Sequence, residues 1–189
     1  MNDKMFPNLI QNYINHQWLS ARAILAVKDY DLSTINITIL NEIPGNTKTY
    51  LSIDAVINQE KFVIYPTEFL NSLDLTDIPS HVLTLKFGVF IIFIQNINLP
   101  RLCKGTRLSM KTLMNKIIEA TILNGKFKGE DVLLPRIPMI STDMNFKFKS
   151  LQFPVRLTFA MTINKVQGQS LQLFGLNLEI HASHIDSCM

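Results

Sequence analysis

A nearly continuous apolar run that follows a helical pattern is the feature that most constrains the fold. Residues 21–27 read Ala-Arg-Ala-Ile-Leu-Ala-Val, a short run bounded by polar residues, which is typical of a strand covered on both faces in a parallel sheet. Apolar residues before it recur at intervals of three and four and predict a helix over residues 8–19. They are Leu9, Ile10, Tyr13, Ile14 and Trp18.

A second helical pattern follows the run. Leu32, Ile35 and Ile39 share one face. Asp31 or Ser33 can cap the start of this helix, and Pro44-Gly45 can end it. The order helix, strand, helix predicts an α/β sheet.

The pattern changes after residue 47 to short strands separated by turn residues. Residues 49–56 alternate and predict a strand, and residues 66–73 predict a short helix that starts at Pro66. Several short strands at this spacing predict a small antiparallel barrel. The other predicted strands are 82–86, 89–94, 107–113, 117–123, 151–158 and 171–179, with a helical or looped segment at 162–169 and a turn at Asn124-Gly125.

Composition excludes several classes of protein. Hydrophobic residues make up 47% of the 189 residues, charged residues make up 17%, and the mean hydropathy is +0.17, so a disordered chain or a coiled coil is a poor interpretation. The longest apolar run, Val89–Ile94, is far shorter than the roughly 20 residues that span a bilayer. With two distant cysteines and no leader pattern at the N-terminus, we expect neither secretion nor disulfides nor zinc.

The charge is unevenly distributed. Between Arg101 and Lys165 there are twelve basic and four acidic residues, so this segment carries +8, whereas the whole chain carries +3. A basic surface of this kind attracts a polyanion. The alternative is an ordinary solvated face.

Most motifs of enzymes are absent from the sequence. It contains no G-x-x-x-x-G-K-[ST] phosphate loop and no G-x-S-x-G elbow, and its histidines show no triad spacing. His181, His184 and Cys188 are three candidate metal ligands, but a four-ligand site needs a partner that the sequence does not supply.

Residues 157–170 form the most informative segment: an apolar strand with a polar tip. Thr162, Asn164 and Lys165 at this tip can donate to phosphate oxygens, and Gly168 allows a close approach of the backbone to a ligand. The carboxyl edge of parallel strands is where open α/β sheets bind ligands. On the residues alone, a surface lysine and an ordinary turn glycine remain the alternative.

The stretch FPVRLTFAMTINKVQGQSL resembles the fifth helicase motif of the petite-integration-frequency (PIF) family of ATP-dependent 5′→3′ DNA helicases of superfamily one, in the version carried by Helitron transposons. The resemblance extends upstream through ARAILAVKDYDLSTIN, YPTEFLNSL and LKFGVFIIFIQNINLPRLCKGTRL, and covers most of residues 6–180. It implies that residues 1–46 begin the second RecA-like domain. Residues 47–150 would then form an inserted Src-homology-three-like barrel, residues 151–180 would return to the RecA-like sheet, and residues 181–189 would be a divergent tail.

The resemblance also implies roles for single residues. Thr162 and Asn164 would lie against single-stranded DNA, and Lys165 matches the pattern too. Gln167 and Gly168 would reach toward the nucleotide phosphates and couple their state to the grip on DNA. Val166 departs from the small polar residue of the family. ATP and Mg²⁺ are the family's cofactors, single-stranded DNA is the partner, and the expected location is nuclear.

Parts that ATP hydrolysis needs are absent from this sequence, because it has no phosphate-loop Lys, no Mg²⁺-binding acid and no sixth-motif arginine finger. We therefore expect a C-terminal part of a helicase, truncated at both ends, that neither binds ATP tightly nor unwinds DNA alone. By resemblance the whole protein would serve repair, recombination, telomere maintenance or transposition. The rival interpretations are a non-catalytic single-stranded DNA-binding module and a non-functional transposon relic. Residues 186–189 are consistent with an out-of-frame reading of the sixth motif.

Overall fold

The fold consists mostly of β-sheets with a few helices. The structure, a computed structural model, describes residues 5–15, 18–19, 22–26, 29–57, 65–75, 77–141, 144–162 and 173–177. The helices within these residues include α2 (Leu9–Asn12), α4 (Asp29–Glu42) and α5 (Thr67–Asn71).

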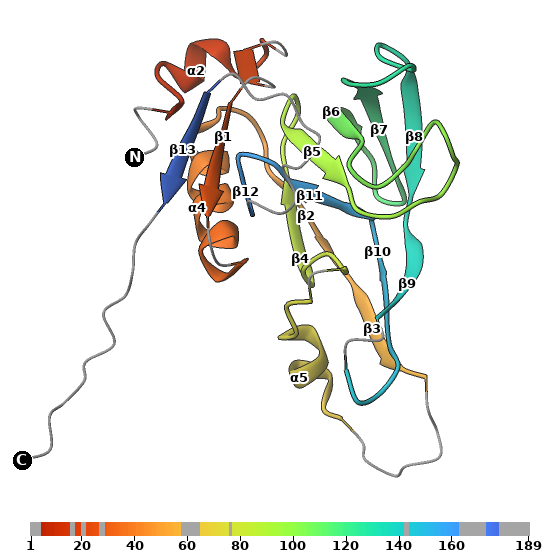
Figure 1. The fold of residues 1–189 in the computed structure, drawn as a ribbon. Helices are drawn as coiled ribbons and strands as arrows, with labels where there is room; N and C mark the ends of the chain where they lie inside the picture. The colour runs from red at the N-terminus through yellow and green to blue at the C-terminus, as the bar shows by residue number, and fades with distance from the viewer. Residues whose placement is uncertain are drawn as a thin grey trace, which may run out of the picture.

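A parallel sheet joins strands from both ends of the chain. Its order is β12 (Ala160–Thr162), β1 (Arg22–Ala26), β13 (Leu173–Asn177), and both neighbours run parallel to β1. The predicted strand at 21–27 is therefore β1, and it lies in the middle of this sheet, with Ala23 and Ile24 fully buried. In Figure 1, α4 lies against this sheet, and α4 packs on both β1 and β12.

The remaining strands form antiparallel sheets. The largest has the order β11 (Val155–Leu157), β5 (Phe90–Phe93), β6 (Arg107–Leu113), β7 (Ile117–Ile122), β8 (Asp131–Pro135). A three-stranded sheet has the order β3 (Ile53–Val56), β10 (Phe148–Gln152), β9 (Ile137–Ser141), and β2 (Lys48–Leu51) pairs with β4 (Val82–Leu85). Figure 1 shows α5 beside the three-stranded sheet, at the end of the molecule away from the large sheet.

One apolar core extends from α4 to the large sheet. Ile39 and Leu40 of α4 share it with Phe90 of β5, Leu108 of β6 and Phe153, which are all at most 2% exposed. A smaller core lies between α5 and the three-stranded sheet, around Leu70, Ile78, Met139 and Phe148.

The structure corrects both predicted helices at the N-terminal end. The pattern at 8–19 predicts one helix, but α2 ends at Asn12, and Asn15 Oδ1 accepts a hydrogen bond from the Trp18 N–H at 3.1 Å. This bond is typical of a helix N-cap, so Asn15 interrupts the helix and begins a new turn. Asp31 and Ser33 do not cap the following helix, because α4 already begins at Asp29.

The predicted strand at 49–56 is in fact two strands in different sheets. Leu51 of β2 pairs with Val82 of β4, whereas Ile53 of β3 pairs with Leu151 of β10. The chain changes sheets at Ser52, whose N–H donates to His81 O at 3.0 Å. Alternation of apolar residues continues through such a corner, so it does not reveal the change of partner.

Candidate nucleic-acid interface

Three parallel strands end together where the predicted DNA-binding segment begins. Thr162, the last residue of β12, is paired with Ala26, the last residue of β1, and Ala26 is paired in turn with Asn177, the last residue of β13. This carboxyl edge is the type of edge at which open α/β sheets bind ligands. The backbone of Thr162 thus lies at this edge, whereas Asn164, Lys165, Gln167 and Gly168 are outside the described residues.

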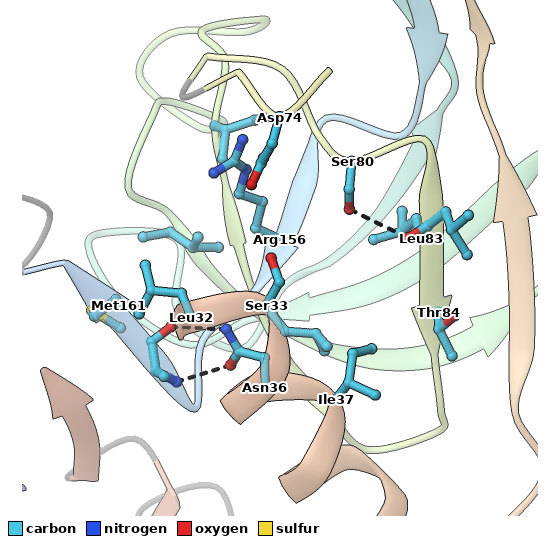
Figure 2. Close-up of a pocket in the computed structure, with 15 residues that line it drawn as sticks. Leu32, Ser33, Asn36, Ile37, Asp74, Ser80, Leu83, Thr84, Arg156 and Met161 are labelled. Atoms are coloured by element: carbon cyan, nitrogen blue, oxygen red, sulfur yellow. Dashed lines mark hydrogen bonds between the residues drawn. The ribbon is translucent and has the colours of Figure 1, made fainter. Parts of the chain in front are cut away.

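A side chain of α4 holds the start of β12. The Asn36 Nδ2 group donates to Ala160 O at 3.0 Å, and the Ala160 N–H donates to Asn36 Oδ1 at 2.9 Å; Figure 2 shows this pair of bonds. The Ile24 N–H donates to Phe159 O at 2.8 Å, so the N–H and C=O of Ala160 point away from β1. Asn36 therefore satisfies backbone groups at the outer edge of the described sheet. The sequence analysis missed this residue.

A cavity of about 240 Å³ lies beside this contact, between α4 and the strands β4, β5, β11 and β12. Its lining is mostly apolar, with Arg156 and Asp74 at one side in Figure 2. The Arg156 Nη2 group donates to the carbonyl oxygens of Leu75 and Ile78, which ties the segment after α5 to β11. Ala160 also lines the cavity, so the cavity borders the strand that leads to Thr162.

The basic surface is smaller than the charge count predicts, because several arginine and lysine side chains are buried or paired with acidic side chains. Arg107 is only 5% exposed, and burial lowers the pKa of its guanidinium group. Arg101 lies 2.8 Å from Glu130, and Lys111 Nζ lies 2.5 Å from Asp131 Oδ2. A net charge counted along the sequence does not reveal which of its charged side chains are buried or paired.

Three exposed lysines lie at one end of the large sheet. Lys104 lies in the β5–β6 loop, and Lys126 and Lys128 lie in the β7–β8 turn. Because β5, β6, β7 and β8 pair in antiparallel order, this loop and this turn lie at the same end. Arg101 lies at the same end of the sheet, since its Nη2 group donates to the carbonyl oxygen of Asp131, the first residue of β8, at 3.2 Å. These three lysines, the sheet-end lysines, could contact a polyanion.

The structure also brings together a serine, an aspartate and a histidine that the sequence does not place side by side. The Ser52 Oγ group donates to Asp54 Oδ2 at 2.7 Å and lies 2.8 Å from His81 Nδ1, while Asp54 Oδ2 lies 3.4 Å from the same nitrogen. A catalytic triad uses the two ring nitrogens separately, one for the nucleophile and one for the acid. This cluster therefore has the geometry of a structural hydrogen-bond network at the β2–β3 corner.

The part of the chain that the structure describes gives no support for a metal site or for a membrane-spanning helix. There, no group of three His, Cys, Asp or Glu side chains is arranged to hold a metal ion. His181, His184 and Cys188 lie outside the described residues. Among the described helices, none combines the length and apolar character needed to cross a bilayer.

Comparison with known proteins connects this fold to a helicase family. Residues 68–113 match the sequence profile of the 2B domain of DNA helicase Pif1. No protein with a curated description matches the chain significantly in sequence.

Solved structures of Pif1 helicases share the fold over most of the chain. The Pif1 helicase from Candida albicans is 19% identical with a TM-score of 0.58, and the match covers 90% of this chain and 46% of that one. Bacteroides Pif1 bound to single-stranded DNA is 19% identical with a TM-score of 0.57, over 87% of this chain and 40% of that one. A structure of two coordinating Pif1 helicases at forked double-stranded DNA gives 18% identity and a TM-score of 0.61, over 91% and 40%.

The chain thus spans less than half the length of the Pif1 structures that it matches. The fold described above resembles that of the corresponding part of those proteins. The chain therefore matches a part of the Pif1-family helicases, with residues 68–113 corresponding to the 2B domain.

Proposed function

We propose that this chain supplies a DNA-contacting part of an ATP-dependent DNA helicase. The observation that carries the proposal is the carboxyl edge of the parallel sheet, where β12 ends at Thr162 and the helicase-like segment 162–168 begins. The fold shared with Pif1 helicases supports it, since one of these was solved with single-stranded DNA and another with ADP-AlF3 and single-stranded DNA.

In this proposal, residues 1–46 and 151–180 belong to one RecA-like domain, and residues 47–150 are an inserted Src-homology-three-like barrel. The pairing of β1 with β12 and β13 supports this division, because it brings the two outer segments into one sheet. The antiparallel strands from β2 to β9 lie within residues 47–150 and support the inserted barrel, whereas β11, in the range 151–180, pairs with β5 of the large sheet.

The chemistry proposed for the edge is phosphate and nucleotide contact. Thr162, Asn164 and Lys165 would donate hydrogen bonds to the backbone of single-stranded DNA, because hydroxyl, amide and ammonium groups suit phosphate oxygens. Gln167 and Gly168 would couple this grip to bound nucleotide. ATP with Mg²⁺ supplies the free energy for translocation in such helicases. The role proposed for this chain is DNA contact and its coupling to bound nucleotide.

The proposal is tested by the binding of the 189-residue chain to a fluorescent oligothymidine, measured by anisotropy at several salt concentrations. We expect binding that weakens as salt rises, by about 0.7 log units per log unit of salt for each phosphate contact. Lys165→Ala should weaken binding and lower the slope by about 0.7. Lys116→Ala is the matched control, since Lys116 is exposed in the β6–β7 turn, away from the sheet-end lysines. Equal effects of the two substitutions would contradict the proposal.

A second candidate is a non-catalytic single-stranded DNA-binding module that uses the sheet-end lysines. Their position at one end of the large sheet favours it. In this case Lys126→Ala combined with Lys128→Ala should weaken binding, and Lys165→Ala should not. A transposon relic without function would show neither effect.

We also propose, from the resemblance, a nuclear location and a role in DNA maintenance or transposition. A tagged chain that remains in the cytoplasm would contradict the location.

A further inference from the structure

We propose that Asn36 is a positioning residue for DNA binding: its side-chain amide fixes the start of β12 and thereby the position of the Thr162 backbone at the carboxyl edge of the parallel sheet, where single-stranded DNA is proposed to bind. The inference deepens the proposed function and rests on it. Asn36 lies on α4, 124 residues from Ala160 in the sequence. We do not propose that Asn36 touches DNA.

The hydrogen bonds between Asn36 and Ala160 resemble those of a neighbouring strand. Each partner gives one donor and one acceptor, at 3.0 and 2.9 Å. Asn36 is 8% exposed and Ala160 is 2% exposed. A buried amide must find hydrogen-bond partners, and a buried strand edge must do the same. The contact therefore satisfies four polar groups that would otherwise lie unpaired in the core.

This contact adds two hydrogen bonds to the strand pairing that holds β12. The strand has three residues and three register pairs with β1. Ala160 precedes Thr162 by two positions, which is about 7 Å of extended chain. A shift or rotation of Ala160 is therefore passed directly to the backbone of Thr162.

The helix that carries Asn36 is itself firmly held. Ile39 and Leu40 are fully buried in the main core. At the end of α4, the buried Lys86 donates from its Nζ atom to Ile43 O at 2.6 Å, which connects the helix end to the β4–β5 turn. Asn36 therefore attaches β12 to an element that is anchored at several points.

Replacement of the Asn36 amide by a carboxyl group separates a positioning role from a general effect on stability. An aspartate at this position, when ionised, has acceptors only, so one carboxylate oxygen would face Ala160 O without a proton between them. When protonated, its hydroxyl can donate to Ala160 O while its other oxygen accepts from the Ala160 N–H, which reproduces the asparagine. Burial favours the protonated form, so the replacement should restore positioning at low pH.

The experiment measures oligothymidine affinity of the 189-residue chain at pH 8.0 and pH 5.5, at a temperature where circular dichroism shows each variant folded. We expect Asn36→Asp to bind about tenfold more weakly than wild type at pH 8.0 and within about twofold of it at pH 5.5. Asn36→Ala should be weak at both. Asn41→Asp is the matched control, because Asn41 is exposed on the same helix. The wild-type chain, measured at both pH values, is the control for effects of Asp74 and Arg156, the charged side chains that line the adjoining cavity.

The outcomes separate this inference from the proposed function. If Lys165→Ala weakens binding but folded Asn36→Asp binds like wild type at pH 8.0, the positioning role is wrong. If Lys165→Ala has no effect, the proposed function is wrong. In the Lys165→Ala background, Asn36→Asp should cost less than in wild type, because both act through the same segment. Equal costs in the two backgrounds would overturn the inference.

Discussion

Replacement of Gln152 by leucine should destabilise the fold substantially, because this side chain joins three segments inside the core. Gln152 is the last residue of β10 and is fully buried. Its Nε2 group donates to Tyr50 O and to His81 O, both at 3.2 Å, and its Oε1 atom accepts from the Phe153 N–H at 3.1 Å. Leucine has a similar volume, so the substitution removes the hydrogen bonds and opens little space.

The expected magnitude follows from the groups that lose a partner. The Phe153 N–H loses this acceptor within the core, at a cost of about 1–3 kcal/mol. The Tyr50 and His81 carbonyl groups each lose a donor, at about 1 kcal/mol each. The His81 carbonyl still accepts from Ser52, so we expect a total near 3 kcal/mol. That is a large share of the roughly 5–15 kcal/mol by which folded proteins are stable.

Urea unfolding followed by far-ultraviolet circular dichroism measures this loss. A decrease of about 3 kcal/mol corresponds to a midpoint roughly 1–1.5 M lower, at a slope of about 2–3 kcal/mol per M. Gln11→Leu is the control, since Gln11 is exposed, and it should change stability by less than about 0.5 kcal/mol. A loss below about 1 kcal/mol for Gln152→Leu, at an unchanged slope, would refute the role given to this residue.

Two other predictions concern nucleotide chemistry and charge. The 189-residue chain should show no DNA-stimulated ATP hydrolysis, because its sequence has no phosphate loop; turnover that is lost in Gln167→Ala would contradict this. The hydrogen bond from Lys111 lowers the pKa of Asp131, so the pairing persists at neutral pH and weakens as the pH falls through the pKa of the folded state. Nuclear magnetic resonance titration of Lys111→Ala should therefore give a higher midpoint for Asp131, and an unchanged midpoint would contradict the pairing.

Local patterns predicted the elements whose sequence differs most from their surroundings. The apolar run at 21–27 corresponds to β1, and the strand predicted at 107–113 has the same bounds as β6. The change from apolar to polar residues near Thr162 likewise predicted a strand that ends in a polar tip. In each case the signal lies within a few neighbouring residues.

Other elements escaped prediction for identifiable reasons. The strands β8 and β9 contain Pro135 and Pro138, and proline argues against a strand unless the strand lies at a sheet edge. Both strands are edge strands here, a fact that only the sheet order shows. The contact between Asn36 and Ala160 likewise depends on the tertiary fold, and an asparagine within a helix face gives no local indication of its partner.

Photo-cross-linking of the chain to an oligonucleotide that contains 5-iodouracil, with mass spectrometric mapping of the linked peptide, tests the central claim most directly. The account predicts cross-links within or next to residues 162–168, where β12 ends at the carboxyl edge of the parallel sheet, and their loss in excess unlabelled single-stranded DNA. Cross-links confined to the loops that carry Lys104, Lys126 and Lys128 would contradict it and favour that end of the large sheet as the binding surface.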